Sequence, residues 1–265
     1  MVNSIIEVSI LCEGDYNMSL IITVYCNEGI VMASDSRATY SYTETLPPPD
    51  KNMPPLIVRE NGAHLTDNAY KTFLTPNGIG VSVCGCSSIN GNSITGIIEE
   101  FLLRNNNLSV SELTKKIHTH FSNLPLKDNI EFVIAGYEQH DGCFNQIIHR
   151  VNTKSPDIEV VDTTQSGALW GGESDILSRL ICDLYLRHEH QDGTETYTRH
   201  TGYPIPWSLF TLQDSIDFAE YGIRTTIDAM KFQRRVKTVG GPIDVLVIKP
   251  TGSKWISHKE LHSTI

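Results

Sequence analysis

The sequence predicts an α+β fold, a four-layer αββα sandwich of two antiparallel sheets that are each covered by helices. Strand-like and helix-like segments follow one another as strands, two helices, strands, two helices and strands. Short turns join neighbouring strand segments, which favours antiparallel pairing, and each apolar sheet face needs a covering layer. The length of 265 residues suits one such domain.

The first half of the chain begins with a hairpin pattern, in which the apolar segments 19–26 and 29–35 flank a short turn. Residues 40–69 contain five prolines and little periodicity, which predicts a long surface loop with at most a short strand at 56–59. The elements expected next are strands at 70–74 and 79–84 and helices at 93–104 and 111–121, the second capped by Ser111.

The second half again places strands before helices. A polar loop at 187–211 separates its two expected helices. The expected elements are strands at 130–137, 144–151 and 158–161, helices at 174–186 and 212–232, and final strands at 243–248 and 254–257.

The composition predicts a cytoplasmic protein without nucleic-acid or membrane partners. Acidic residues number 31 and basic residues 21, and the resulting net charge of −10 disfavours contact with a phosphate backbone. No apolar run is long enough to span a membrane. The first 17 residues lack the basic start and the cleavage site of a secretory signal.

Cysteine and histidine spacing predicts neither a disulfide framework nor a metal site. The six cysteines form no paired or zinc-binding pattern, so they are interpreted as free thiols of a reducing compartment. His188, His190 and His200 share one polar loop, but their spacing fits no standard ligand set. The loop is interpreted as solvated and partner-facing, and no metal or other cofactor is expected.

Three motifs in fixed order carry a resemblance to a known family. They are GIVMASDSRAT (Gly29–Thr39), AYKTFLTPNGIGVSVCG (Ala69–Gly85) and GGPIDVLVI (Gly240–Ile248). From Ser19 to about Ser257 the chain resembles a proteasome-type N-terminal nucleophile (Ntn) hydrolase, in the style of the bacterial relatives of proteasome β subunits. The resemblance implies the αββα sandwich of the Ntn hydrolase fold.

The resemblance also implies four catalytic residues. In the family a fixed number of residues separates the nucleophile from the aspartate, and the same number separates Ser19 from Asp35. The family's spacing between the catalytic lysine and the oxyanion glycine likewise matches the spacing between Lys71 and Gly85. A hydroxyl is a poor nucleophile until a base removes its proton. An α-amino group, with a pKa of about 7.7–8.0, can be that base near neutral pH. Lys71 would favour the alkoxide, Asp35 would hold the ammonium group of Lys71, and the Gly85 amide would face the oxyanion.

The amine of Ser19 can act as a base only if Ser19 is the first residue. Residues 1–18 are therefore expected to be a leader, a propeptide or a mis-called start, and residues 19–265 the hydrolase domain. Met18 is followed by a small residue, so methionine aminopeptidase can remove it. The codons for Glu13-Gly14-Asp15 can contain a bacterial ribosome-binding sequence, which would make Met18 the true start of the protein. Self-cleavage before Ser19 and a retained N-terminal strand are the alternatives.

The chain departs from the family where other members place polar groups near the amine. Gly172 stands where a serine is expected, and Val236 and Val239 replace an aspartate and a serine before the late glycine pair. Glu173 and Ser174 are the neighbouring polar residues. They are the candidates for orienting the amine in this chain.

The resemblance implies a peptide or protein substrate and a homo-oligomeric ring or open ring, and it leaves open whether an ATP-dependent unfoldase takes part. Arg37 and Thr39 would belong to the substrate-binding wall, with backbone groups of Thr39 pairing with an extended substrate. Two other functions stay open. One is a non-catalytic assembly subunit of a proteasome-like particle, and the other is an amidase that acts on a small molecule.

Overall fold

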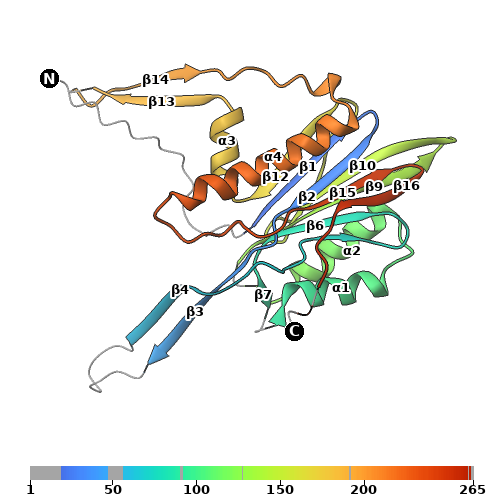
Figure 1. Cartoon of the computed structure of the whole chain (residues 1–265), viewed down its shortest axis with the longest axis horizontal. Helices are drawn as coiled ribbons and strands as arrows, with labels where there is room; N and C mark the ends of the chain where they lie inside the picture. Colours follow the sequence, from blue (N-terminus) through green and yellow to red (C-terminus); the bar gives the residue numbers. More distant parts are fainter. Residues whose placement is uncertain are drawn as a thin grey trace.

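The computed structural model describes residues 19–46, 56–89, 92–126, 128–190, 192–261 and 263. Two five-stranded antiparallel sheets and four α-helices form the body of the described part (Figure 1). The predicted leader, residues 1–18, lies outside the described residues. None of the described helices is long and apolar enough to cross a membrane.

The first sheet contains the predicted N-terminal hairpin, which is confirmed as β1 and β2. It also contains a strand that the sequence analysis did not identify, β12, whose sequence GALWGG is rich in glycine and so has a weak strand pattern. In spatial order the strands are β12 (Gly167–Gly172), β1 (Leu20–Cys26), β2 (Gly29–Ser34), β15 (Asp244–Lys249) and β16 (Gly252–Ser257).

The second sheet is built from the segments between the two halves of the first. A strand was predicted close to each of its members. In spatial order they are β11 (Ile158–Val160), β10 (Cys143–Asn152), β9 (Ile130–His140), β6 (Gly80–Gly85) and β5 (Thr72–Leu74). A two-residue pair, β7 (Ser88–Ile89) with β8 (Asn92–Ser93), leads from this sheet to the first helix.

The helices lie on the outer faces of the sheets. They are α1 (Ile94–Arg104), α2 (Val110–Ser122), α3 (Asp175–Ile181) and α4 (Leu212–Lys231), with a 3₁₀ turn η1 (Trp207–Leu209) before α4. The predicted cap of α2 at Ser111 is wrong. Ser109 accepts a hydrogen bond from the Glu112 amide, and Glu112 accepts one from the Ser109 amide, so this reciprocal capping box starts the helix one residue earlier.

Buried side chains form three clusters, which separate successive layers of helices and sheets. The first lies between α1, α2 and the second sheet, and the third lies between the two sheets. The remaining cluster joins the first sheet to α3 and α4. Strand β1 contributes to two of them, because successive side chains of a strand point to opposite faces. Leu20, Ile22 and Val24 contact the helix side, whereas Ile21 lies between the sheets.

The surface loop predicted for residues 40–69 is wrong. Most of it forms a long hairpin of β3 (Ala38–Leu46) and β4 (Leu56–Thr66), here named the first arm. All five prolines fall in residues 47–55, outside the described residues, so they do not interrupt either strand. Alternating threonine and tyrosine in β3 favours an extended strand.

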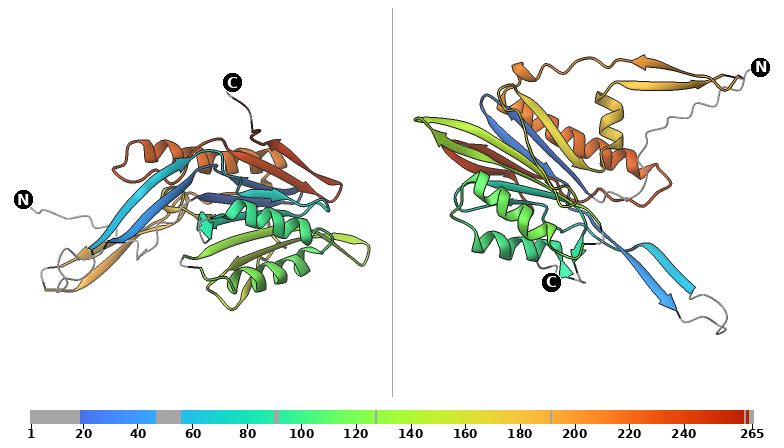
Figure 2. Two further views of the ribbon diagram at one scale, coloured as in Figure 1. Left: turned by 90° about the horizontal axis from the view of Figure 1, so that it is seen from below. Right: turned by 180° about the vertical axis from the view of Figure 1, so that it is seen from behind.

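The polar loop predicted for residues 187–211 is also wrong in its first part, and the helix predicted for 174–186 ends at Ile181. Strands β13 (Leu184–Glu189) and β14 (Glu195–His200) pair as a hairpin, the second arm. The missed signal was Asp192-Gly193, a hairpin dipeptide in which Gly193 has a φ of +78°. Both arms project from the same side of the body (Figure 2).

Candidate active site

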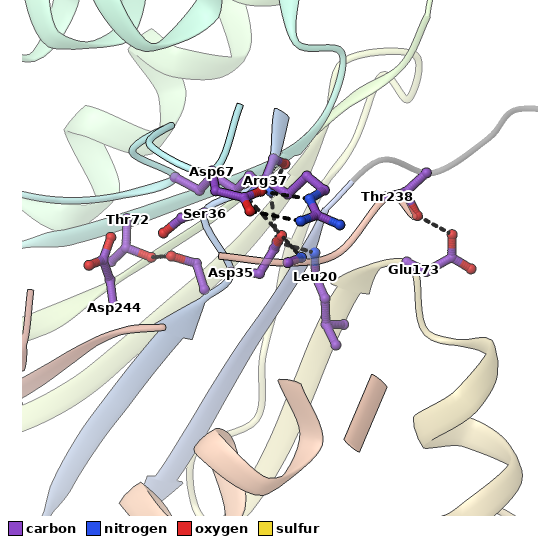
Figure 3. Close-up of polar contacts among 12 residues, drawn as sticks. Leu20, Asp35, Ser36, Arg37, Asp67, Thr72, Glu173, Thr238 and Asp244 are labelled. Atoms are coloured by element: carbon purple, nitrogen blue, oxygen red, sulfur yellow. Dashed lines mark hydrogen bonds and ion pairs between the residues drawn. The ribbon is translucent and has the colours of Figure 1, made fainter. Parts of the chain in front are cut away.

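The structure brings three predicted catalytic residues together at one end of the first sheet. Ser19 directly precedes β1, Asp35 directly follows β2, and Lys71 directly precedes β5. Since β1 and β2 are antiparallel partners, the start of one lies beside the end of the other. Figure 3 shows the Asp35 carboxylate beside the backbone nitrogen of Leu20 at this end.

Asp35 is fully buried and each of its carboxylate oxygens accepts two hydrogen bonds. Oδ1 accepts from the Leu20 amide at 2.9 Å and from Lys71 Nζ at 2.7 Å. Oδ2 accepts from the amides of Arg37 at 3.0 Å and Gly240 at 2.9 Å. A carboxylate is stable away from water only with such partners. Asp35 therefore connects the start of β1, Lys71 and the segment that precedes β15.

Lys71 is held as a buried cation. Its side chain is only 6% exposed, and Nζ donates to Asp35 and to the Arg37 carbonyl at 2.5 Å. Burial lowers the pKa of the Lys71 ammonium below its usual value, and the adjacent Asp35 carboxylate opposes that shift. The result is a compact positive charge, fixed in direction, at the wall of the pocket that also contains Ser19.

Ser19 has a backbone conformation that serine rarely adopts. Its φ is +103°, in the region that favours glycine. Its carbonyl accepts a 2.7 Å hydrogen bond from the Glu173 amide, and the neighbouring Leu20 amide is held by Asp35. The steric strain of a positive φ requires a preceding peptide group. A Ser19 that is the first residue of the chain would be free of this strain.

Two glycines are required where the chain passes this end of the sheets. Gly85 has a φ of +108°, and a Cβ there would overlap the Asn129 carbonyl oxygen. Gly172 has a φ of +86°, and a Cβ there would overlap the Ser19 carbonyl oxygen. Any side chain at either position would displace neighbouring backbone. A serine at position 172 would therefore not fit this backbone.

A narrow pocket of about 20 Å³ adjoins Ser19; we name it the nucleophile pocket, after the role predicted for Ser19. Apart from Lys71, none of its lining residues is acidic or basic. Cys84 and Cys86, on either side of Gly85, both line it. The other lining residues are Ala38, Tyr40, Ala69, Tyr70, Val83, Ser87, Ser93, Ile94 and Thr95. This composition suits an uncharged group beside the nucleophile.

The two residues predicted for the substrate wall take different positions. The Arg37 guanidinium binds the Asp67 carboxylate through two bonds of 2.6 and 2.7 Å, and so ties together the two ends of the first arm (Figure 3). Thr39 is buried and its carbonyl accepts from the Ser87 hydroxyl at 3.1 Å. The Thr39 hydroxyl has no hydrogen-bond partner in the described part of the chain.

The two residues predicted to orient the amine, Glu173 and Ser174, also differ in their hydrogen bonds. The Glu173 carboxylate accepts hydrogen bonds from Arg235 and from Thr238, both at 2.9 Å. Burial raises the pKa of Glu173 above its usual value, whereas Thr238 and Arg235 oppose that shift. Ser174 caps α3 without a side-chain hydrogen bond to the helix.

Sequence reasoning overlooked Arg235 and Thr238. It considered only Val236 and Val239 before the late glycine pair, and Val239 is a buried residue of the core. The cluster of basic residues in QRRVKT, directly before Val239, was the available signal.

Comparisons with models of protein families and with curated proteins find no match to this chain. The geometry and chemistry of the site are therefore what a functional proposal can rest on.

Proposed function

We propose that this chain is a proteasome-like peptidase or amide hydrolase whose nucleophile is Ser19 and whose general base is the α-amine of the same residue. One observation carries the proposal. The buried Asp35 carboxylate binds both the Lys71 ammonium and the first amide of β1, directly beside Ser19. A buried lysine–aspartate pair is costly in free energy. Its position against a small pocket with a serine is the arrangement expected of an activated hydroxyl.

In the proposed reaction the Ser19 amine takes the hydroxyl proton while Oγ attacks the substrate carbonyl carbon. The carbonyl oxygen becomes an oxyanion, which the Gly85 amide stabilises. The resulting ammonium then gives its proton to the leaving amine as the C–N bond breaks. Water hydrolyses the ester left on Ser19, again with the amine as base. The Lys71 charge lowers the energy of the alkoxide-like states.

The fold belongs to the same proposal. Two five-stranded antiparallel sheets, with one buried cluster between them and one under the helices on each side, support a four-layer αββα sandwich of the Ntn hydrolase type. The five cysteines in the described part of the chain are free, which is typical of a reducing compartment. We therefore place the proposed reaction in the cytoplasm.

The active protein is expected to begin at Ser19. An amide nitrogen is not a base, so any residue joined to Ser19 would abolish the proposed mechanism. Intact mass and N-terminal sequencing of active protein check this. The Ser19→Ala variant serves as the control. It should retain residues 1–18 if the chain cuts itself with the Ser19 hydroxyl, and begin at residue 19 if Met18 is the true start. Active protein that retains Met18 would rule out the mechanism.

Peptides with an uncharged residue before the cleaved bond are expected to be hydrolysed about 10-fold or more faster than those with Asp, Glu, Lys or Arg there. The reason is that the nucleophile pocket offers no free counter-charge, since Lys71 is already paired with Asp35. A tenfold difference corresponds to about 1.4 kcal/mol. Matched fluorogenic peptides that differ at this position alone provide the measurement. A preference for acidic residues would mean that the Lys71 charge is open to substrate.

A further inference from the structure

One short segment, residues 235–240, contacts the surroundings of Ser19 from two sides. At its end, the Gly240 amide donates to Asp35 at 2.9 Å. Near its start, Arg235 and Thr238 donate to the two oxygens of the Glu173 carboxylate, each at 2.9 Å. Figure 3 shows the Thr238–Glu173 contact on one side of Leu20. The segment therefore joins Asp35 to a second, partly buried carboxylate.

That second carboxylate belongs to the residue directly across from Ser19. Strands β1 and β12 pair with Leu20 opposite Gly172, so the next pair outward is Ser19 with Glu173. The 2.7 Å hydrogen bond from the Glu173 amide to the Ser19 carbonyl confirms this register. Residues opposite each other in antiparallel strands lie about 4.5–5.5 Å apart. The Glu173 carboxylate therefore belongs to the residue that faces Ser19 across the strand pair.

The surroundings of Glu173 keep its carboxylate in one orientation. Its side chain is 13% exposed and that of Arg235 is 29% exposed, and Thr238 is buried. Arg235 also donates to Asp175 at 3.2 Å, at the start of α3. The charged groups that face Glu173 are thus Arg235, which favours its ionised form, and Asp175, which disfavours it. A threonine hydroxyl and a shared arginine leave the carboxylate little freedom to rotate.

We propose that Thr238 and Arg235 are positioning residues for the nucleophile, holding the Glu173 carboxylate where it accepts a hydrogen bond from the α-amine of Ser19. This inference rests on the proposed function. A neutral amine that donates one N–H to Glu173 has its lone pair directed elsewhere, toward the Ser19 hydroxyl. After the amine takes the hydroxyl proton, the carboxylate faces an ammonium, and that opposite charge stabilises the protonated state.

The test compares variants of the full-length gene product, processed as the wild type is. Thr238→Val removes the hydroxyl at nearly constant volume, and Thr238→Ser keeps it. Glu173→Gln removes the charge. Thr226→Val is the matched control, because Thr226 is also a buried threonine with a hydrogen-bonded hydroxyl. Its hydroxyl donates to the Gly222 carbonyl within α4 and not to Glu173. The measurement is kcat/KM against pH on one peptide, together with the melting temperature.

Thr238→Val is expected to lower the plateau of kcat/KM about 10-fold or more, with Thr238→Ser within about 2-fold of the wild type. Glu173→Gln should move the acidic limb of the profile of kcat/KM against pH to lower pH by about one unit or more. The sign follows because removing a negative charge beside the Ser19 amine lowers the pKa of that amine. Thr226→Val should leave both quantities unchanged.

Either of two results would overturn the inference while hydrolysis itself stands. One is an unmoved acidic limb in Glu173→Gln. The other is a loss of activity in Thr238→Val that Thr226→Val matches, or that merely follows a lower melting temperature. Wild-type protein that hydrolyses no peptide and no small amide would instead remove the proposed function, and this inference with it.

Discussion

Replacing Ser19 by alanine is expected to lower kcat/KM for peptide hydrolysis by about 10⁴-fold or more, because the variant has no atom that can form the ester intermediate. The fold should be retained, since one oxygen is lost from a residue whose carbonyl accepts from the Glu173 amide and whose neighbour Leu20 donates to Asp35. Turnover of a fluorogenic peptide panel is the measurement. Ser82→Ala provides the control, because Ser82 is a buried serine that hydrogen-bonds Thr72 inside the core.

Each outcome of that experiment selects one function. Ser19→Thr should retain hydrolysis, because threonine supplies the same hydroxyl and amine. Hydrolysis that survives in Ser19→Ala would exclude Ser19 as the nucleophile. A wild-type protein that cleaves small amides but no peptide would favour the small-molecule amidase. One that cleaves neither would favour a non-catalytic assembly subunit.

Replacing Lys71 by methionine is expected to reduce kcat/KM about 10³-fold or more, since the positive charge that favours the alkoxide is lost. The variant should also be less stable by about 3 kcal/mol, because Asp35 is left buried without its counter-ion. Lys71→Arg should be inactive too, as a planar guanidinium does not fit the site of a compact ammonium. Denaturant unfolding and peptide turnover measure the two effects separately.

The chain contains a matched control for this experiment. Lys259 pairs with Asp244, and their side chains are 5% and 0% exposed, close to the 6% and 0% of Lys71 and Asp35. Lys259 does not line the nucleophile pocket. Lys259→Met should therefore lose similar stability, whereas its activity below the unfolding temperature should fall far less than that of Lys71→Met, since Lys259 acts on Lys71 only through its charge. If activity falls in step with stability in both variants, the role of Lys71 is structural rather than electrostatic.

Local patterns in the sequence were enough for much of the secondary structure. The hairpin of β1 and β2 was predicted because its two apolar segments and its turn lie within a short stretch of chain. The long helix α4 was predicted for the same reason, from its apolar period. The capping box at Ser109 and the Asp192-Gly193 turn are also short patterns within the sequence, and the sequence analysis failed to recognise them.

The two arms show where local reading fails. The prolines of residues 47–55 suggested a loop for the whole of 40–69, although they lie between β3 and β4 and not within them. In the second arm, β13 opens with three consecutive apolar or aromatic residues and β14 is exposed throughout, so neither strand shows the alternation of apolar and polar residues that marks a half-buried strand.

The sequence by itself determined which residues were candidates for chemistry: Ser19, Asp35 and Lys71 are the residues that the resemblance of its motifs to a known family implies. Only the tertiary structure decided how they are held. Asp35 takes one of its donors from Gly240, 205 positions away, and Glu173 takes one from Thr238, 65 positions away. No pattern along the chain encodes such contacts, because they form when separate strands and loops converge at one end of a sheet. A buried carboxylate needs hydrogen-bond donors in place of water, so the polar contacts of the site arise from the packing.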